Sequence, residues 1–452
     1  MSAPAVAPGA SVDAVREAID LALAELKRAG VAGEVAAARS ESWSAQVRLG
    51  ELETVQSAVT RGLRITAYAS GNRHASTTTS DTDPAAVRRA VATAVELAGY
   101  ADDDPWAGLP PLAETGIAAV DLGGDDPAYA RLDRDAFVAR VVSAEKTALG
   151  SDPRVTNSHR SSASASRGRH WYASTDGVLV ERVGTRFGDS VVVVARDAAG
   201  ERQTGGFGTR ARRLDALKPA DAVGREAGHR AVRGFGWRSV PSGRFPVLFD
   251  REVASELLDT LASAVSGGAV YRGSTFLAKA LGTVIASPVV TVVDDPLIPE
   301  ALGSRPCDGE GVRARRLTVV EQGRLGTFLV AAYSARRLHH PLTGHDGGSS
   351  NLLLLPGTAT RDDLLRELGT GLLVTDLQGM GVDLASGTWS KGASGFWVEG
   401  GQVQFPVQEV TLAGNLREML AGIRTVGDDP LDESSTSSPS LVIDGLTIGG
   451  KG

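Results

Sequence analysis

Cysteine is almost absent from this sequence, which has one, Cys307, in 452 residues. One cysteine cannot form a disulfide within the chain, and it excludes a cysteine-rich zinc site. The composition is typical of the reducing cytosol, so we expect a cytoplasmic location. Arg305 is the one basic neighbour of the thiol, and we therefore interpret Cys307 as a buried or inert residue.

Long apolar runs and an excess of basic residues are also missing. No window reaches the ~20 apolar residues that a membrane-spanning helix needs, so we expect no membrane partner. Residues 1–10 lack the basic start and apolar run of a signal peptide, and we expect them to be a disordered lead-in. The net charge of -7 argues against a general nucleic-acid binder, so we expect no nucleic-acid partner.

Common catalytic motifs are absent as well. The sequence contains no HExxH zinc helix, Walker loop, G-x-S-x-G nucleophile turn or C-x-x-C pair. Glycine is abundant, with 54 residues, which implies many tight turns and a β-rich architecture. The length of 452 residues exceeds what one ordinary core accommodates, so two domains are expected.

The order of predicted elements divides the chain at Gly234–Gly243. Residues 11–235 alternate helices with runs of strands, which predicts an α+β domain with an antiparallel sheet covered by long helices. Residues 244–452 contain short glycine-rich strands and predict a β-barrel or sandwich-like domain. Within it, the polar loop Asp428–Ser440 need not be ordered.

Individual elements follow from local patterns. Helices are predicted where apolar residues recur at helical spacing behind a capping residue. These helices cover residues 11–28, 83–98, 133–149, 215–233, 252–265 and 361–368. Strands are predicted where apolar and polar residues alternate between turn residues. In the first domain these strands cover residues 43–49, 54–60, 62–69, 74–79, 167–174, 178–186, 190–196 and 201–208.

The stretch Ser386–Asn415 predicts a glycine-rich loop followed by a hairpin that turns at Gly400-Gly401. The loop offers hydroxyls, an ammonium group and bare backbone N–H groups, which suit close approach to a peptide or an anion. Its candidate substrate-binding residues are Ser390, Lys391, Gly392 and Ser394. The alternative interpretation is a tight barrel corner that needs glycine only for its geometry.

Histidines cluster only in RRLHHPLTGHDGG, which contains His339, His340 and His345. Imidazole groups could bind a transition metal. However, Pro341 and Gly344 indicate a loop in which nothing fixes a ligand geometry. The alternative is a solvated loop or a substrate contact, and we include His345 among the candidate substrate-binding residues.

Carboxylates occur in two close groups, Asp294-Asp295 and Asp308-Gly309-Glu310. Paired carboxylates could bind Ca²⁺ or Mg²⁺, or could act as a general acid and base. Aspartate and glycine in such short runs are also ordinary turn residues. Both interpretations remain open from the residues alone.

Several short motifs together resemble the TldD/PmbA family, the modulators of DNA gyrase that act as metal-dependent peptidases. The motifs extend from about residue 40 to the C-terminus, and their order and spacing are more specific than any one of them. They include R-G-L-R at 61–64, Y-R-G-S-T-F-L at 271–277, T-V-V-D-D-P at 291–296, S-R-P-C-D-G-E-G at 304–311, Y-S-A-R at 333–336 and T-L-A-G-N at 411–415.

The resemblance implies one of two kinds of subunit. TldD-like subunits bind a metal through an H-E-x-x-x-H helix that follows an apolar strand, and through a cysteine far downstream. Here the strand corresponds to residues 246–249, and the three helix positions correspond to Asp250, Arg251 and Ser255. An arginine cannot act as a general base, and a serine is a poor ligand for a transition metal. Cys307 lies outside the downstream segment, so the resemblance implies a TldE/PmbA-like chain without a metal or catalytic residues.

The leading hypothesis is therefore the non-metal-binding subunit of a heteromeric TldD/TldE-type metallopeptidase. The chain would help to form the cleft and to position unfolded or modified peptide substrates. A TldD-like subunit would be its partner in a heterodimer or larger assembly and would carry Zn²⁺. Two alternatives stay open, namely an autonomous hydrolase with a metal site at His339, His340 and His345, and a pure scaffold or binding module.

Overall fold

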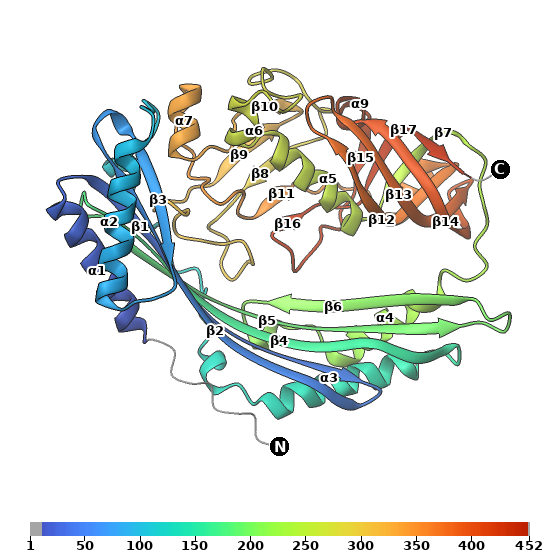
Figure 1. Cartoon of the computed structure of the whole chain (residues 1–452). Helices are drawn as coiled ribbons and strands as arrows, with labels where there is room; N and C mark the ends of the chain where they lie inside the picture. Colours follow the sequence, from blue (N-terminus) through green and yellow to red (C-terminus); the bar gives the residue numbers. More distant parts are fainter. Residues whose placement is uncertain (1–10, 451–452) are drawn as a thin grey trace.

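The computed structural model describes residues 11–450, so the predicted disordered lead-in at residues 1–10 lies outside the described residues. Its N-terminal part is a curved sheet of six strands in the order β3-β2-β1-β4-β5-β6 (Figure 1). The strands are β1 (Ala32–Arg48), β2 (Glu51–Tyr68), β3 (His74–Thr79), β4 (Val155–Ser174), β5 (Leu179–Arg196) and β6 (Arg202–Ala211). All neighbours in this sheet are antiparallel, as predicted.

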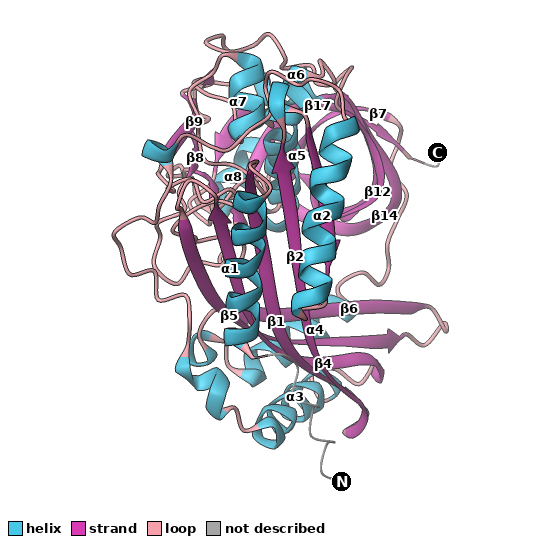
Figure 2. Ribbon diagram, turned by 60° about the vertical axis from the view of Figure 1, so that its left-hand side comes forward, coloured by secondary structure: helices cyan, strands magenta, loops and turns pink. Residues whose placement is uncertain are grey.

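Four long helices cover one face of this sheet (Figure 2). They are α1 (Val12–Arg28), α2 (Pro84–Tyr100), α3 (Arg134–Leu149) and α4 (Ala220–Val232). The helices α1 and α2 pack near β1 to β3, whereas α3 and α4 pack near β4 to β6. Capping side chains start α1, α2 and α3 where predicted, and among them Ser11 accepts a hydrogen bond from the Ala14 N–H at 3.2 Å and Asp133 accepts one from the Ala136 N–H at 2.9 Å. The helix predicted at residues 215–233 begins later, at Ala220, behind Pro219 and without a capping side chain.

Two of the predicted strand breaks in this sheet are wrong. The strand β2 continues through Gly62, which pairs with Ala38 of β1. The strand β5 continues through the predicted turn at Gly188-Asp189, where Gly188 pairs with Ser164 on one side and Arg210 on the other. Pairing with neighbouring strands outweighs the turn preference of glycine and aspartate at these positions.

The C-terminal part contains two further sheets. In the first, β14-β13-β12-β7-β17 form a closed ring because β14 pairs back with the end of β17, and β15 pairs with the beginning of β17. These strands are β7 (Gly243–Phe249), β12 (Gly371–Asp383), β13 (Thr388–Glu399), β14 (Gln402–Asn415), β15 (Ile423–Val426) and β17 (Leu441–Gly449). The second has the order β10-β9-β8-β11-β16, from β8 (Val292–Asp294), β9 (Leu317–Glu321), β10 (Arg324–Leu325), β11 (Leu352–Leu354) and β16 (Thr436–Ser437). The predicted α+β class with a barrel-like C-terminal part is confirmed.

Helix α5 (Arg251–Ala264) contacts both of these sheets, and the largest apolar core of the protein forms around it. Phe249, Leu257 and Trp389 are buried members of this core. The shorter helices are α6 (Gly267–Tyr271), α7 (Ala332–Leu338), α8 (Arg361–Leu368) and α9 (Leu416–Ala421). Among residues 11–450, no helix has the length and apolar character needed to cross a membrane.

Two predicted loops take a different form in the structure. The glycine-rich loop before the hairpin is the first half of β13, which pairs with β12 and β14. The polar loop Asp428–Ser440 is held against α5, where the Thr436 hydroxyl donates to Asp259 at 2.6 Å and the Ser438 N–H donates to Ser255 at 3.2 Å. Because its small polar groups form hydrogen bonds with α5, the segment adopts a defined conformation.

Candidate functional site

The two faces of the six-stranded sheet carry different side chains. The face under the helices is apolar, with Trp43, Phe187 and Val191 buried there. Because side chains alternate between faces along a strand, the intervening residues point to the other side. We call this side, which faces the C-terminal part in Figure 1, the inner face. Its small residues are Ser40, Ser42, Ser44, Ser162, Ser164, Ser166, Gly168, Gly184, Gly188, Ser190, Gly206 and Gly208.

The sequence predictions do not include a small polar face on this sheet, although the sequence contains a pattern that indicates one. Serine and alanine alternate from Ser162 to Ser166, and the two alanines, Ala163 and Ala165, are buried under the helices. This alternation indicates a strand with one apolar side and one small polar side. The predicted strand at residues 167–174 begins only after it, whereas β4 starts at Val155.

Four hollows lie between the inner face or its β6 edge and the C-terminal part, and together we call them the interdomain cleft. The tyrosine hollow, beside Tyr172, has a volume of about 350 Å³. The arginine hollow, at Arg182, has a volume of about 470 Å³. The two β6 hollows have volumes of about 340 and 460 Å³, and both are lined by Gly206, Arg230 and Glu252.

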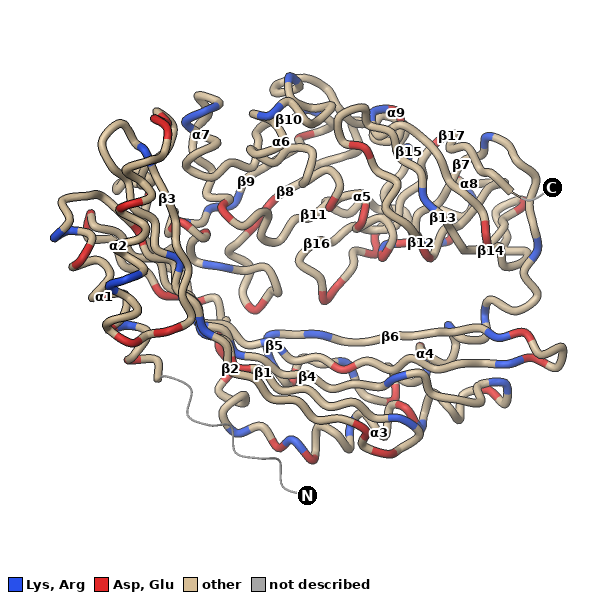
Figure 3. The backbone as a smooth tube through the Cα atoms, viewed as in Figure 1, with Lys and Arg blue, Asp and Glu red and all other residues tan. Residues whose placement is uncertain are grey.

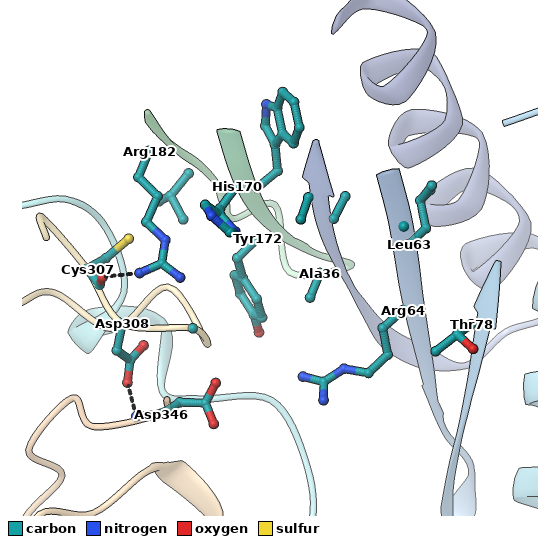
Figure 4. A pocket seen from close by; sticks show the side chains of 16 residues that line it. Ala36, Leu63, Arg64, Thr78, His170, Tyr172, Arg182, Cys307, Asp308 and Asp346 are labelled. Atoms are coloured by element: carbon teal, nitrogen blue, oxygen red, sulfur yellow. Dashed lines mark hydrogen bonds between the residues drawn. The ribbon is translucent and has the colours of Figure 1, made fainter. Parts of the chain in front are cut away.

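Acidic side chains gather beside the tyrosine hollow, where Figure 4 shows Asp308 and Asp346 near Tyr172. The Tyr172 hydroxyl donates to Glu34 at 2.9 Å, and Glu310 accepts a hydrogen bond from the first N–H of α7 at 2.8 Å. Burial, and then the charges of Asp346 and Asp308, raise the pKa of Glu310 to about 8. A carboxyl group that keeps its proton near neutral pH could donate a hydrogen bond to a bound group. The neighbouring Cys307 is buried, as predicted, and burial raises the pKa of its thiol to about 11.

Replacing Glu310 with glutamine should stabilise the protein at alkaline pH. The folded state holds the carboxyl proton up to about pH 8, whereas the ordinary pKa is 4.5, so folding becomes less favourable as pH rises through this interval. Glutamine does not ionise, so Glu310→Gln should show no gain near pH 4.5 and its full gain above pH 8. Urea unfolding across this interval measures the difference. The exposed control Glu321→Gln should keep the wild-type pH dependence, and the same dependence in Glu310→Gln would contradict the expectation.

The predicted substrate-binding residues of the glycine-rich segment all lie on β13. Lys391 Nζ lies 2.7 Å from Glu256 of α5, so a peptide carboxylate would have to compete with this ion pair. Gly392 pairs with β12 and β14, and Ser390 does the same two residues earlier. Ser394 lines one of the β6 hollows. The role of these four residues as peptide contacts remains a prediction.

The three clustered histidines occupy separate surroundings. The ring of His339 lies edge-on to Trp106, with 5.3 Å between centroids, and His340 Nδ1 lies 2.7 Å from the carbonyl oxygen of the next residue. His345 is buried, and its Nε2 lies 3.1 Å from Asp294. In the described part of the chain, no group of three or more His, Cys, Asp or Glu residues is arranged to hold a metal. The loop therefore does not bring the three imidazoles together, and the role of His345 as a substrate contact remains a prediction.

Similarity to known proteins decides the family. Sequence models of three PmbA/TldA metallopeptidase domains match in order, with domain 1 at residues 33–98, the central domain at 129–235 and the C-terminal domain at 242–450. The chain is 34% identical to the metalloprotease PmbA of Escherichia coli O157:H7, over 97% of this chain and 96% of that protein. The chain belongs to the PmbA/TldD metallopeptidase family.

Other members of the PmbA/TldD family agree with this assignment. The chain is 34% identical to the metalloprotease PmbA homologue of Haemophilus influenzae, over 96% of each protein. A crystal structure of a candidate modulator of DNA gyrase from Bacteroides thetaiotaomicron superposes with a TM-score of 0.91 at 26% identity. That similarity covers 97% of this chain and all of the other. The family predicted from the sequence motifs is confirmed.

The positions that the resemblance assigns to the metal ligands of the PmbA/TldD family lie at the start of α5, beside the cleft. Asp250 caps the helix, and its carboxylate lies 3.0 Å from an Arg361 nitrogen. Arg251 lines one of the β6 hollows and brings a cation to the place of a general base. The Ser255 hydroxyl donates to the Arg251 carbonyl at 2.9 Å and accepts from Ser438. These residues do not fit a zinc ion, because the carboxylate and hydroxyl are engaged and the guanidinium repels a cation.

Proposed function

We propose that this chain is the non-metal-binding subunit of a heteromeric TldD/TldE-type metallopeptidase. The observation that carries the proposal is the start of α5, where Asp250, Arg251 and Ser255 occupy the ligand positions and are unsuited to zinc. A TldD-like partner would supply Zn²⁺, the water that it activates and the general base. The PmbA/TldD family is named for metallopeptidase activity, and the proposal places the metal in the other subunit.

The surroundings of α5 support the assignment of the metal to the partner subunit. The segment Thr436–Ser440 lies against the helix, and Thr436 and Ser438 are bonded to it. At the first turn, Glu252 accepts two hydrogen bonds from Arg230 of α4, at 2.5 and 2.8 Å. The carboxylates of Asp250 and Glu252 and the hydroxyl of Ser255 are thus engaged by groups of this chain, whereas a catalytic metal site needs an open position for water.

The interdomain cleft is the surface that we expect to position the peptide. Within residues 11–450, β6 pairs only with β5, so its second backbone edge is free beside the two β6 hollows. An extended peptide can add to such an edge through backbone hydrogen bonds, so we expect unfolded or modified chains to bind there. The proposed substrate contacts remain Ser390, Lys391, Gly392, Ser394 and His345.

The proposal is tested by separating the subunits. The purified chain alone should contain no stoichiometric zinc and should not cleave an unfolded peptide, whereas mixing it with a TldD-like subunit should restore cleavage. Mass spectrometry of the metal in each subunit and chromatography of the peptide products measure this. Cleavage by the isolated chain that a chelator abolishes would overturn the proposal. Unchanged cleavage by the TldD-like subunit with and without this chain would favour a scaffold.

A further inference from the structure

Four arginine side chains from both parts of the protein line the arginine hollow. Arg182 and Arg186 project from the inner face of β5, Arg212 directly follows β6, and Arg305 comes from the C-terminal part. Further basic residues lie along β6, which is the edge strand nearest the C-terminal part (Figure 3). The hollow therefore concentrates positive charge in a protein whose net charge is -7.

Among the described residues, no arginine of this hollow is paired with a carboxylate at close range, although burial lowers the pKa of Arg305 and the charges of Asp294, Asp308 and Asp346 act in the opposite direction. Within residues 11–450, Arg182, Arg186, Arg212 and Arg305 form no ion pair. Arginines on the opposite side of the same sheet behave differently, since Arg167 pairs with Asp125 and Arg169 pairs with Glu181. The side chain of the exposed Arg186 also forms no hydrogen bond within residues 11–450. Its guanidinium group is available to a ligand.

Arg212 has a structural role that holds the hollow open. Its guanidinium donates to the carbonyls of Ala301, Leu302 and Ser304 at 2.6, 2.9 and 2.7 Å, which fixes the loop that carries Arg305. Burial, and then the charges of Arg186 and Arg182, lower the pKa of Arg212 to about 10. An anion bound between these side chains would relieve their mutual repulsion.

Two arginines on the opposite face of the sheet are paired with carboxylates of the protein, whereas those of the hollow are not paired in the described part of the chain, which suits the hollow to a carboxylate from a ligand. We propose that the arginine hollow binds a carboxylate group of the peptide substrate, from either an acidic side chain or the C-terminus. Guanidinium groups bind carboxylates with two parallel hydrogen bonds, and Arg186 has no competing partner. The floor between them is formed by Ser40, Gly168 and Gly184, which lie in one row across β1, β4 and β5. These residues lack large side chains, so an extended chain can lie close to the sheet. This inference rests on the proposed peptide-binding role.

The test uses the full chain and two labelled peptides that differ only in one residue, glutamate or glutamine, with amidated C-termini. Fluorescence anisotropy should show about tenfold tighter binding of the glutamate peptide, the range expected for a charge-assisted hydrogen bond. Arg186→Gln should remove most of this preference and leave the glutamine peptide bound as before. Arg202 of β6 lies on the inner face, like Arg186, but outside the hollow. The control variant Arg202→Gln should therefore keep the preference for the glutamate peptide. A third peptide with a free C-terminus distinguishes the two carboxylate sources.

Several results would overturn the inference. Equal binding of the two amidated peptides, together with no gain from a free C-terminus, would do so while leaving the proposed function intact. Inorganic phosphate that binds in an Arg186-dependent manner without displacing the glutamate peptide would assign the hollow to a different anion. A preference that survives in both Arg186→Gln and Arg182→Gln would place the carboxylate elsewhere. Failure of the proposed function appears separately, as zinc or cleavage activity in the isolated chain.

Discussion

Replacing Asp294 with alanine should lower the free energy of unfolding by about 3–5 kcal/mol, the usual cost of removing one partner of a buried ionic pair. Asp294 is 1% exposed and lies 3.1 Å from His345 Nε2. Its carboxylate also accepts hydrogen bonds from the Ser350 N–H at 2.7 Å and the Ser350 hydroxyl at 2.6 Å. Alanine would leave these donors buried without a partner and would release a loop that lines the arginine hollow.

The pH dependence gives this prediction a second readout. Burial raises the pKa of Asp294, but the hydrogen bonds and charge of His345 and the bonds from Ser350 outweigh it, so the pKa is lowered below 3.8. A carboxylate with a lowered pKa stabilises the folded state above its ordinary pKa and loses that contribution as pH falls through the folded-state pKa. The difference between wild type and Asp294→Ala should therefore be full at neutral pH and should shrink below pH 3.8.

The neighbouring carboxylate offers a matched control. Asp295 lies 3.3 Å from Arg316, which is 55% exposed, and accepts a hydrogen bond from the Leu297 N–H at 3.0 Å, so Asp295→Ala should cost only about 1 kcal/mol. Chemical denaturation of both variants from neutral to acidic pH makes the comparison. A cost for Asp294→Ala no larger than that of the control would mean that the buried pair does not hold this loop. That result would favour the prediction that His345 contacts the substrate over a structural role for its contact with Asp294.

Local signals in the sequence were sufficient for helix starts and tight turns. Ser11 and Asp133 cap the helices that they were predicted to start, and Gly400-Gly401 makes the predicted hairpin turn. These features depend on residues only a few positions away. The continuity of β5 through Gly188 depends instead on partners in β4 and β6, so glycine there was misread as a turn.

The same difficulty explains the misread start of β13. The abundance of glycine in this segment predicted a loop, but Gly395 permits a close approach between β13 and β12, since a Cβ there would lie 1.9 Å from the Leu373 carbonyl oxygen. Asp250 and Arg251 were found because the relevant residues are contiguous and the family motif marks them. The arginine hollow could not be found in this way, because Arg182 and Arg305 meet only when the two parts of the chain are folded together.

Gly205 of β6 shows how one small residue sets the geometry of the cleft. A Cβ at this position would lie 2.0 Å from the Ala231 nitrogen and 2.5 Å from the Arg230 carbonyl carbon, both in the backbone of α4. No rotamer change can relieve a contact with backbone atoms, so α4 would have to move away from the sheet. We therefore expect Gly205→Val to destabilise the protein by about 3 kcal/mol, the upper part of the range for overpacking.

The displacement should also reach the start of α5. Arg230 of α4 holds Glu252 at 2.5 Å, and both residues line the β6 hollows, so moving α4 should loosen this link across the cleft. Urea denaturation measures the stability, and hydrogen exchange should show faster opening of α4. Gly62→Val is the matched control, since a Cβ at Gly62 of β2 meets no atom within 4 Å and its stability should be unchanged or slightly higher. Equal stabilities of the two variants would mean that α4 can shift without cost, and that the cleft is not braced by its contact with β6.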